Sequence, residues 1–187
     1  MLVSHGVTVE RATERDASLL ANLLELYIHD LSDVFPIEIG GDGRFGYGTL
    51  PLYWSKPDTH FAFLFRRHAK VAGFALVTRG SPATSNPEDL DLAEFFVLRS
   101  ARRSGVGRIA ASLLFNQLPG NWVVRVCEAN SAALAFWENA IARYTRGARS
   151  KSLWPGKHHL FCVHSFRSVD PESPGLLDSP PPDRFVR

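Results

Sequence analysis

A strand, a basic turn and a helix that opens on two glycines follow one another near the middle of the chain. Leu90–Leu98 is a long apolar run typical of a buried strand, and about Arg108–Leu118 has helical spacing of apolar residues. Helix N-termini present unpaired N–H groups and the positive end of the helix dipole, and glycines let a ligand approach the backbone. The turn therefore predicts a phosphate cradle at the start of the helix, with Arg102, Arg103 and Arg108 adding charge-assisted bonds.

The residues of this turn also allow two alternatives. Gly105 and Gly107 could only permit a tight connection, with the arginines forming a solvated rim. Gly105-x-Gly107-x-x-Ala110 also fits the dinucleotide fingerprint, with Glu128 near the place of a ribose-binding acid. A basic stretch separates these glycines from their strand, however, and too little chain follows Glu128 to build the second half of a dinucleotide fold.

The remaining periodicity predicts a mixed α+β sheet. An amphipathic helix capped by Thr13 runs to Leu31, and a further helix capped by Asn130 covers Ser131 to about Ile141. Strands alternate with helices only in the second half, which argues against a doubly wound fold. The expected strands are Val7–Val9, Phe61–Phe65, Val71–Thr78, Leu90–Leu98, Trp122–Cys127, Tyr144–Ser150 and His159–Phe166.

Composition limits the function classes. A formal net charge of +2 is too small for a general polyanion surface, so we expect no nucleic-acid partner. No apolar run approaches the ~20 residues that cross a bilayer and no signal peptide is evident, which favours a cytoplasmic protein without a membrane partner. The two cysteines and the histidines lack metal-site spacing, so no metal is expected. Residues 1–167 are expected to form one domain, and the proline-rich 168–187 a disordered tail.

Three motifs together resemble the GNAT-type N-acetyltransferases. Arg102-Arg103-Ser104-Gly105-Val106-Gly107 is similar to the family's Arg/Gln-x-x-Gly-x-Gly/Ala motif, and Glu94–Leu98 to the strand that pairs with the pantetheine arm. Asn130-x-x-Ala133-x-x-Phe136-Trp137-Glu138 resembles the family's Asn-x-x-Ala helix. Leu26–Ser32, Asp42-Gly43, Leu52-Tyr53-Trp54 and Gly73–Val77 further resemble a bacterial subgroup of predicted acetyltransferases with no assigned substrate.

The resemblance implies a mostly antiparallel sheet of about seven strands, splayed between strands 4 and 5 and flanked by about four helices. Acetyl-CoA, as cosubstrate, would lie in the splay. Main-chain groups of Phe96, Val97 and Leu98 would pair with its pantetheine arm, and the Val97 N–H would polarise the thioester carbonyl. The residues expected to hold the rest of the coenzyme are Arg102, Arg103, Ser104, Gly105, Val106, Gly107, Arg108, Asn130, Ala133, Phe136 and Trp137.

Transfer to an amine needs a base, because a free alkyl ammonium with a pKa near ~10.4 is mostly protonated at pH 7. Glu94 is the candidate, acting through water, and is expected either to be desolvated among apolar neighbours or to be turned out by a bulge. Trp137 stands where the family usually has a tyrosine acid, and an indole cannot supply that proton. The thiolate could leave unaided, or Tyr53, Tyr47 or Tyr144 could substitute, with Tyr53 our candidate.

The acceptor, a small-molecule or peptide amine, would be held by the first helix, the glycine-rich loop between residues 32 and 59, and the final strands. Tyr27, Asp30, Tyr47 and Trp54 are the candidate contacts, the acid for a cationic amine and the rings for an apolar body. The missing tyrosine keeps an alternative open, a non-catalytic acyl-CoA-binding or regulatory domain. Pairing of two copies into a homodimer is a further expectation.

Overall fold

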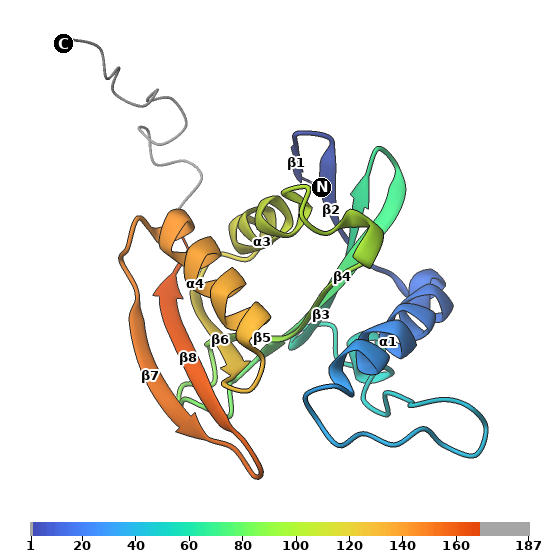
Figure 1. The fold of residues 1–187 in the computed structure, drawn as a ribbon. Helices are drawn as coiled ribbons and strands as arrows, with labels where there is room; N and C mark the ends of the chain where they lie inside the picture. Colours follow the sequence, from blue (N-terminus) through green and yellow to red (C-terminus); the bar gives the residue numbers. More distant parts are fainter. Residues whose placement is uncertain (1, 169–187) are drawn as a thin grey trace, which may run out of the picture.

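The computed structural model describes residues 2–168 and shows a twisted eight-stranded sheet with helices on both faces (Figure 1). The strands lie in the order β1-β2-β3-β4-β5-β6-β8-β7. The mixed, mostly antiparallel sheet is confirmed, with one strand more than expected because β1 adds an edge hairpin to β2. The strands are β1 (Leu2–Ser4), β2 (Val7–Arg11), β3 (His60–Arg67), β4 (Lys70–Arg79), β5 (Leu90–Val97), β6 (Asn121–Cys127), β7 (Ser150–Pro155) and β8 (Leu160–Arg167).

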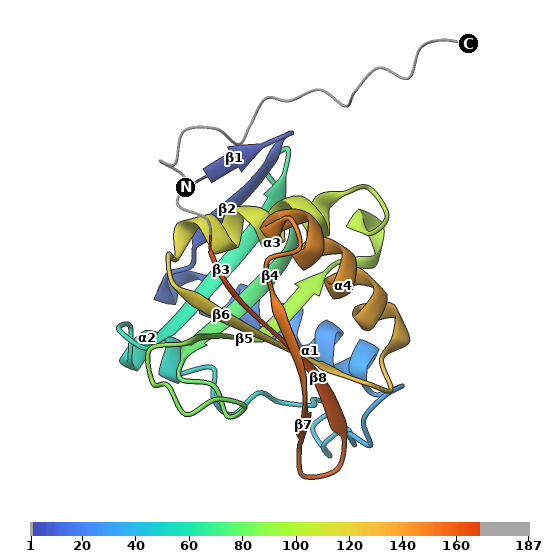
Figure 2. The ribbon, with the colours of Figure 1, turned by 90° about the vertical axis from the view of Figure 1, so that its left-hand side faces the viewer.

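Each face of the sheet has its own helices and its own core. α1 (Ala17–Leu31) covers one face, and α3 (Val106–Gln117) and α4 (Ser131–Thr145) cover the other (Figures 1 and 2). The short α2 (Leu52–Ser55) interrupts the long loop after α1. Leu20, Leu24 and Phe96 belong to the core under α1, whereas Leu114, Trp122 and Trp137 belong to the core under α3 and α4. None of the helices within residues 2–168 is long and apolar enough to cross a membrane.

The sheet splits between β5 and β6, as the family resemblance implies. These strands run parallel and pair only over Leu90–Leu92 with Trp122–Val124. Beyond Leu92 a bulge disturbs β5, because Val77 of β4 pairs with Leu92 and the next residue, Leu76, pairs with Glu94. The two halves of the sheet separate from this point, which leaves one edge of β5 without a strand partner (Figure 1).

Two predicted boundaries near the C-terminus change. The strand expected over Tyr144–Ser150 is wrong, because α4 continues to Thr145 and ends at Arg146, whose φ is 53°. Ile141 and Thr145 are buried on the same side of the helix, so packing outweighs the strand-like composition of this segment. Ser168 still belongs to the sheet region, since its N–H donates to the Gly120 carbonyl at 2.9 Å. The rest of the expected tail lies outside the described residues.

Candidate active site

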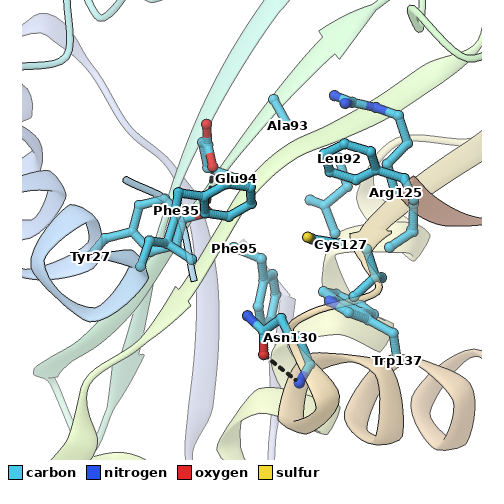
Figure 3. A pocket seen from close by; sticks show the side chains of 15 residues that line it. Tyr27, Phe35, Leu92, Ala93, Glu94, Phe95, Arg125, Cys127, Asn130 and Trp137 are labelled. Atoms are coloured by element: carbon cyan, nitrogen blue, oxygen red, sulfur yellow. Dashed lines mark hydrogen bonds between the residues drawn. The ribbon is translucent and has the colours of Figure 1, made fainter. Parts of the chain in front are cut away.

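A cavity of about 350 Å³ lies where β5 and β6 separate, and it reaches both faces of the sheet (Figure 3). Alternation along the strands divides its lining into two sides. The α4 side consists of Leu92, Phe95, Val124, Val126, Asn130, Ala133 and Trp137. Tyr27, Phe35 and Glu94 lie together on the α1 side (Figure 3), with Leu31 of α1. Alternation along β6 and β8 assigns Arg125, Cys127 and Phe161 to the same side. A reagent held under α4 can therefore meet a second reagent held under α1, at the break in the sheet.

Glu94 occupies the α1 side of this break, and two tyrosines donate to its carboxylate. The Tyr27 hydroxyl, from α1, lies 2.5 Å from Glu94 Oε2. The Tyr47 hydroxyl, from the glycine-rich loop, lies 3.0 Å from Glu94 Oε1. The sequence allowed either burial of Glu94 among apolar residues or a bulge that turns it outward. The structure contains both a bulge and a buried Glu94: the bulge places Leu92 on the opposite face of the sheet, whereas Glu94 points inward beside Phe96.

The surroundings of Glu94 favour a base with an elevated pKa. Burial raises the pKa of the Glu94 carboxyl above its ordinary value, and the hydrogen bonds from Tyr27 and Tyr47 offset only part of this rise. Burial and the charge of Glu94 also raise the pKa of both tyrosine hydroxyls. The phenols therefore stay protonated and act as donors, while Glu94 is suited to accept a proton.

An ion pair that the sequence analysis missed lies next to Glu94. Arg125 of β6 bonds Asp91 of β5 through Nε at 2.9 Å and Nη2 at 2.8 Å, and Ser81 donates to the same carboxylate. The ion pair joins β5 to β6 at the end of their paired segment. It therefore holds the two strands together at the point where they begin to diverge. In the strand Trp122–Cys127, alternation places Arg125 on the opposite face from Val124 and Val126. A charged residue at such a position is the sequence signal that could have indicated this ion pair.

The N-terminus of α3 has the features expected of a phosphate site. Gly105 caps the helix in the left-handed region at φ 83°, which favours glycine. Ile109 N–H donates to Gly105 O at 3.1 Å, so the amides of Val106, Gly107 and Arg108 precede the first intrahelical bond. A Cβ on Gly107 would lie 3.2 Å from Phe136 Cε2, so a side chain here would press on Phe136 and narrow the space beside the main chain of this turn. The residues present therefore fit a coenzyme diphosphate.

At the unpaired edge of β5, one main-chain N–H group faces the gap between β5 and β6. Leu98 N–H is bonded to Ala72 O on the β4 side at 2.9 Å, and Phe96 O also faces β4, close to Gly73. Because alternate residues of a strand direct their main-chain groups to opposite sides, Val97 N–H faces away from β4. Of the three residues predicted to pair with pantetheine, Val97 is the one whose amide is placed to do so.

Asp30 and Arg102 meet one another, and Asp30 does not line the cavity. Arg102 Nη2 lies 2.5 Å from Asp30 Oδ2, and Arg102 Nε donates to Val97 O at 2.8 Å. Arg99 donates to Asp30 Oδ1 at 3.1 and 2.7 Å. Burial works against the charge, but the hydrogen bonds from Arg102 and Arg99 outweigh it and lower the pKa of Asp30. This carboxylate is neutralised by two arginines, so it ties α1 to the turn before α3.

Asp30→Asn is expected to weaken acetyl-CoA binding about fivefold, because loss of two ion pairs loosens the turn that presents the α3 amides. Isothermal titration calorimetry with acetyl-CoA checks the dissociation constant. Asp33→Asn is the control, since Asp33 is exposed at the same end of α1 and forms no ion pair within residues 2–168. Tighter binding by Asp30→Asn would mean that Asp30 withholds Arg102 from the coenzyme instead.

α4 brings Asn130 and Trp137 to the cavity in different roles. The Asn130 side-chain oxygen caps α4 by accepting from Ala133 N–H at 3.0 Å, which leaves its amide NH₂ available to a ligand (Figure 3). Trp137 is only 6% exposed, and its ring packs edge-on against Phe95 and Phe136 at 4.9 and 4.8 Å. Trp137 therefore serves mainly as a core residue that forms one wall of the cavity.

The remaining predicted aromatic residues lie around the cavity without lining it. Tyr53 is buried and packs edge-on against His60 at 5.1 Å, and Trp54 packs beside the core under α1. The Tyr144 hydroxyl donates to Asn116 Oδ1 at 2.7 Å. Tyr27 and Tyr47 are thus the two tyrosines that reach Glu94, and Phe35, Cys127 and Phe161 are lining residues that the sequence analysis did not single out.

The sequence model described as the Acetyltransferase (GNAT) family matches residues 21–141, more than half of the chain. The chain belongs to the GNAT acetyltransferase family. The match includes most of α1, all of β5 and α3, and most of α4. The predicted resemblance is confirmed, and the chain is an acetyltransferase of this family. A search of the curated proteins found no match to the sequence.

Solved structures with the same fold support this assignment at low sequence identity. An acetyltransferase from Thermus thermophilus is 17% identical with a TM-score of 0.62, covering 86% of this chain and 96% of that one. A spermidine N-acetyltransferase from Vibrio cholerae, solved with CoA and spermine, is 11% identical with a TM-score of 0.59, covering 88% and 97%. The ribosomal-protein-S18-alanine N-acetyltransferase from Escherichia coli is 14% identical with a TM-score of 0.55, covering 89% and 97%. These likenesses establish the GNAT fold of the chain.

Proposed function

We propose that this GNAT chain transfers the acetyl group of acetyl-CoA directly to a primary amine, with Glu94 as the base acting through water. The observation that carries the proposal is the position of Glu94. Its carboxylate lies at the break in the sheet, in a cavity that continues to the α4 side, and burial raises its pKa. A base placed there can take a proton from an amine on the α1 side.

The coenzyme would enter from the α3 and α4 side. The amides of residues 103–108 would bind its diphosphate, with Arg103 and Arg108 as exposed cations beside them. Asn130 Nδ2 would donate to the pantetheine arm, and Ala133 and Phe136 would pack along it. The Val97 N–H would donate to the thioester oxygen and stabilise the negative charge that develops there. Bound in this way, acetyl-CoA supplies an activated acetyl carbonyl and a thiolate leaving group.

In the proposed transfer, the protein supplies one general base, and no side chain is needed as a general acid. Water carries one proton of the ammonium group to Glu94 before attack. The neutral nitrogen then bonds the acetyl carbon and gives up a second proton to water as the carbon–sulfur bond breaks. A CoA thiol has a pKa near that of cysteine, so the thiolate can leave and take its proton from solvent. Tyr27 and Tyr47 are committed to Glu94, and their raised pKa makes them weak acids. Their role is to orient the carboxylate.

Gly107→Val is expected to weaken acetyl-CoA binding tenfold or more, because its side chain would press on Phe136 and Val97 and cover the exposed amides. Calorimetry measures the dissociation constant, and the thermal midpoint of the free variant separates this effect from a folding defect. If a folded Gly107→Val variant bound acetyl-CoA with an unchanged dissociation constant, the coenzyme would not bind at this turn.

The alternative of a non-catalytic acyl-CoA-binding domain rests on Trp137, which is packed into the core at the place of the usual acid. Release of free CoA thiol, measured with acetyl-CoA and a range of amines, separates the two functions. We expect thiol release that depends on the amine, with the acetylated amine identified by mass spectrometry. Binding of acetyl-CoA without thiol release for any amine would favour the alternative.

A further inference from the structure

The charges lining the cavity leave room for one ammonium group. Glu94 and Arg125 are the two charged side chains among the lining residues, and Arg125 is already neutralised by its bidentate pair with Asp91. Glu94, in contrast, is held by the neutral hydroxyls of Tyr27 and Tyr47. One ammonium group on the acceptor would therefore neutralise the charge of Glu94. A second ammonium group would have no unpaired carboxylate among the lining residues.

Two acidic residues of α1, Asp30 and Glu25, are committed elsewhere. Asp30 is paired with Arg99 and Arg102. Glu25, on α1, accepts from the main-chain N–H groups of Phe45 and Gly46 at 2.7 and 3.1 Å, which anchors the glycine-rich loop. A polyamine that places one amine at Glu94 would thus leave its other ammonium groups without a partner in the cavity. An acceptor with its own carboxylate would meet Glu94 and Asp91 with no unpaired cation.

The walls of the α1 side are largely apolar rings. Phe35, from the loop after α1, packs edge-on against His159 at 4.9 Å, so this contact joins the loop to the β7–β8 hairpin across the cavity. Phe161 also lines the cavity, and its ring centroid lies 5.6 Å from that of Trp154. Figure 3 shows Tyr27 and Phe35 on the same side of the cavity as Glu94. Such surfaces favour an acceptor with an apolar, preferably aromatic, body.

The size of the cavity restricts the acceptor further. Its volume of about 350 Å³ includes the α4 side, where the acetyl end of the coenzyme would lie. The volume that remains on the α1 side suits the body of a small molecule with a single ring.

We propose that the acceptor is a small primary monoamine whose amino group is attached to an aromatic or similarly apolar body, with Phe35 and Phe161 as its walls and Glu94 at its nitrogen. This proposal rests on the proposed transfer reaction and specifies its substrate class. Binding buries the body between the rings, and its single ammonium group balances Glu94 before the proton is removed.

Initial rates of thiol release with acetyl-CoA test the proposal on four acceptors. Phenethylamine is the expected substrate, phenylalanine adds a carboxylate to it, spermidine adds ammonium groups, and a peptide beginning with Phe adds length. We expect kcat/KM for phenethylamine to exceed that of each other acceptor about tenfold or more. A preference for spermidine, phenylalanine or the peptide would overturn the proposal while leaving the transfer reaction intact. Thiol release with none of the four, in a protein that binds acetyl-CoA, would overturn both.

Phe35→Ala supplies the matching structural test. It is expected to raise KM for phenethylamine about tenfold, with the dissociation constant for acetyl-CoA unchanged, because the removed ring lies on the α1 side. Phe45→Ala is the control, since Phe45 belongs to the same loop but does not line the cavity. Equal effects of the two variants on KM would contradict the assignment of Phe35 to the acceptor.

Discussion

Glu94→Gln is expected to lower kcat by about 10²- to 10⁴-fold, the usual contribution of a positioned general base. Glutamine keeps the size of the side chain. Its carbonyl oxygen can accept from one of the two hydroxyls of Tyr27 and Tyr47, and its NH₂ can donate to the oxygen of the other, so the loop and α1 should keep their positions. The dissociation constant for acetyl-CoA should stay the same, because the diphosphate would bind at α3. Steady-state kinetics with an active amine, together with calorimetry for acetyl-CoA, measure both quantities.

The pH profile provides the control for this variant. Glu94 must be deprotonated to act, and its raised pKa places the acidic fall of kcat at a higher pH than an ordinary glutamate would give. The Glu94→Gln variant should have a low kcat and should not show the acidic fall of kcat. Glu38→Gln, which changes an exposed carboxylate in the glycine-rich loop, should alter neither. An undiminished kcat for Glu94→Gln would show that the base lies elsewhere.

Gly73→Ala is expected to destabilise the protein by about 3 kcal/mol, at the upper end of the cost of overpacking. A Cβ at Gly73 would lie 2.0 Å from Phe96 O and 3.0 Å from Val97 Cα, so β4 and β5 would have to separate. Because the contacted atoms belong to the backbone, no side-chain rotation can relieve the contact. The displaced residues include Val97, so acetyl-CoA binding should weaken as well. Urea denaturation monitored by circular dichroism gives the free energy of unfolding.

Gly48→Ala is the matched control for Gly73→Ala. A Cβ at Gly48 meets no atom within 4 Å, so we expect its unfolding free energy to change by less than about 0.5 kcal/mol or to rise slightly. A similar stability for both variants would mean that β4 and β5 can separate without cost, and that the close approach at Gly73 does not hold the catalytic strand.

Local sequence patterns were sufficient for the fold and for the helix starts at Gly105 and Asn130. The apolar run of Leu90–Leu98, the glycines at 105 and 107 and the Asn130 cap each determine structure within a few residues, so spacing alone reveals them. The family motifs lie on the same segments. Features that depend on neighbours in sequence are therefore those that the sequence analysis placed correctly.

Features that depend on distant contacts were harder to predict. The bulge that moves Leu92 to the opposite face arises from the register between β4 and β5, which composition does not specify. Asp30 and Arg102 are far apart in sequence, so their ion pair could not be distinguished from separate roles in acceptor and coenzyme binding. The same holds for Arg125 and Asp91, which meet only because β5 and β6 are adjacent.

A crystal structure with bound acetyl-CoA tests the central claim most directly. We expect the diphosphate within hydrogen-bonding distance of the main-chain nitrogens of residues 103–108, and the thioester oxygen on Val97 N–H with Glu94 across the break in the sheet. A coenzyme whose diphosphate binds away from the α3 N-terminus, or whose acetyl group lies outside the cavity between β5 and β6, would contradict the account.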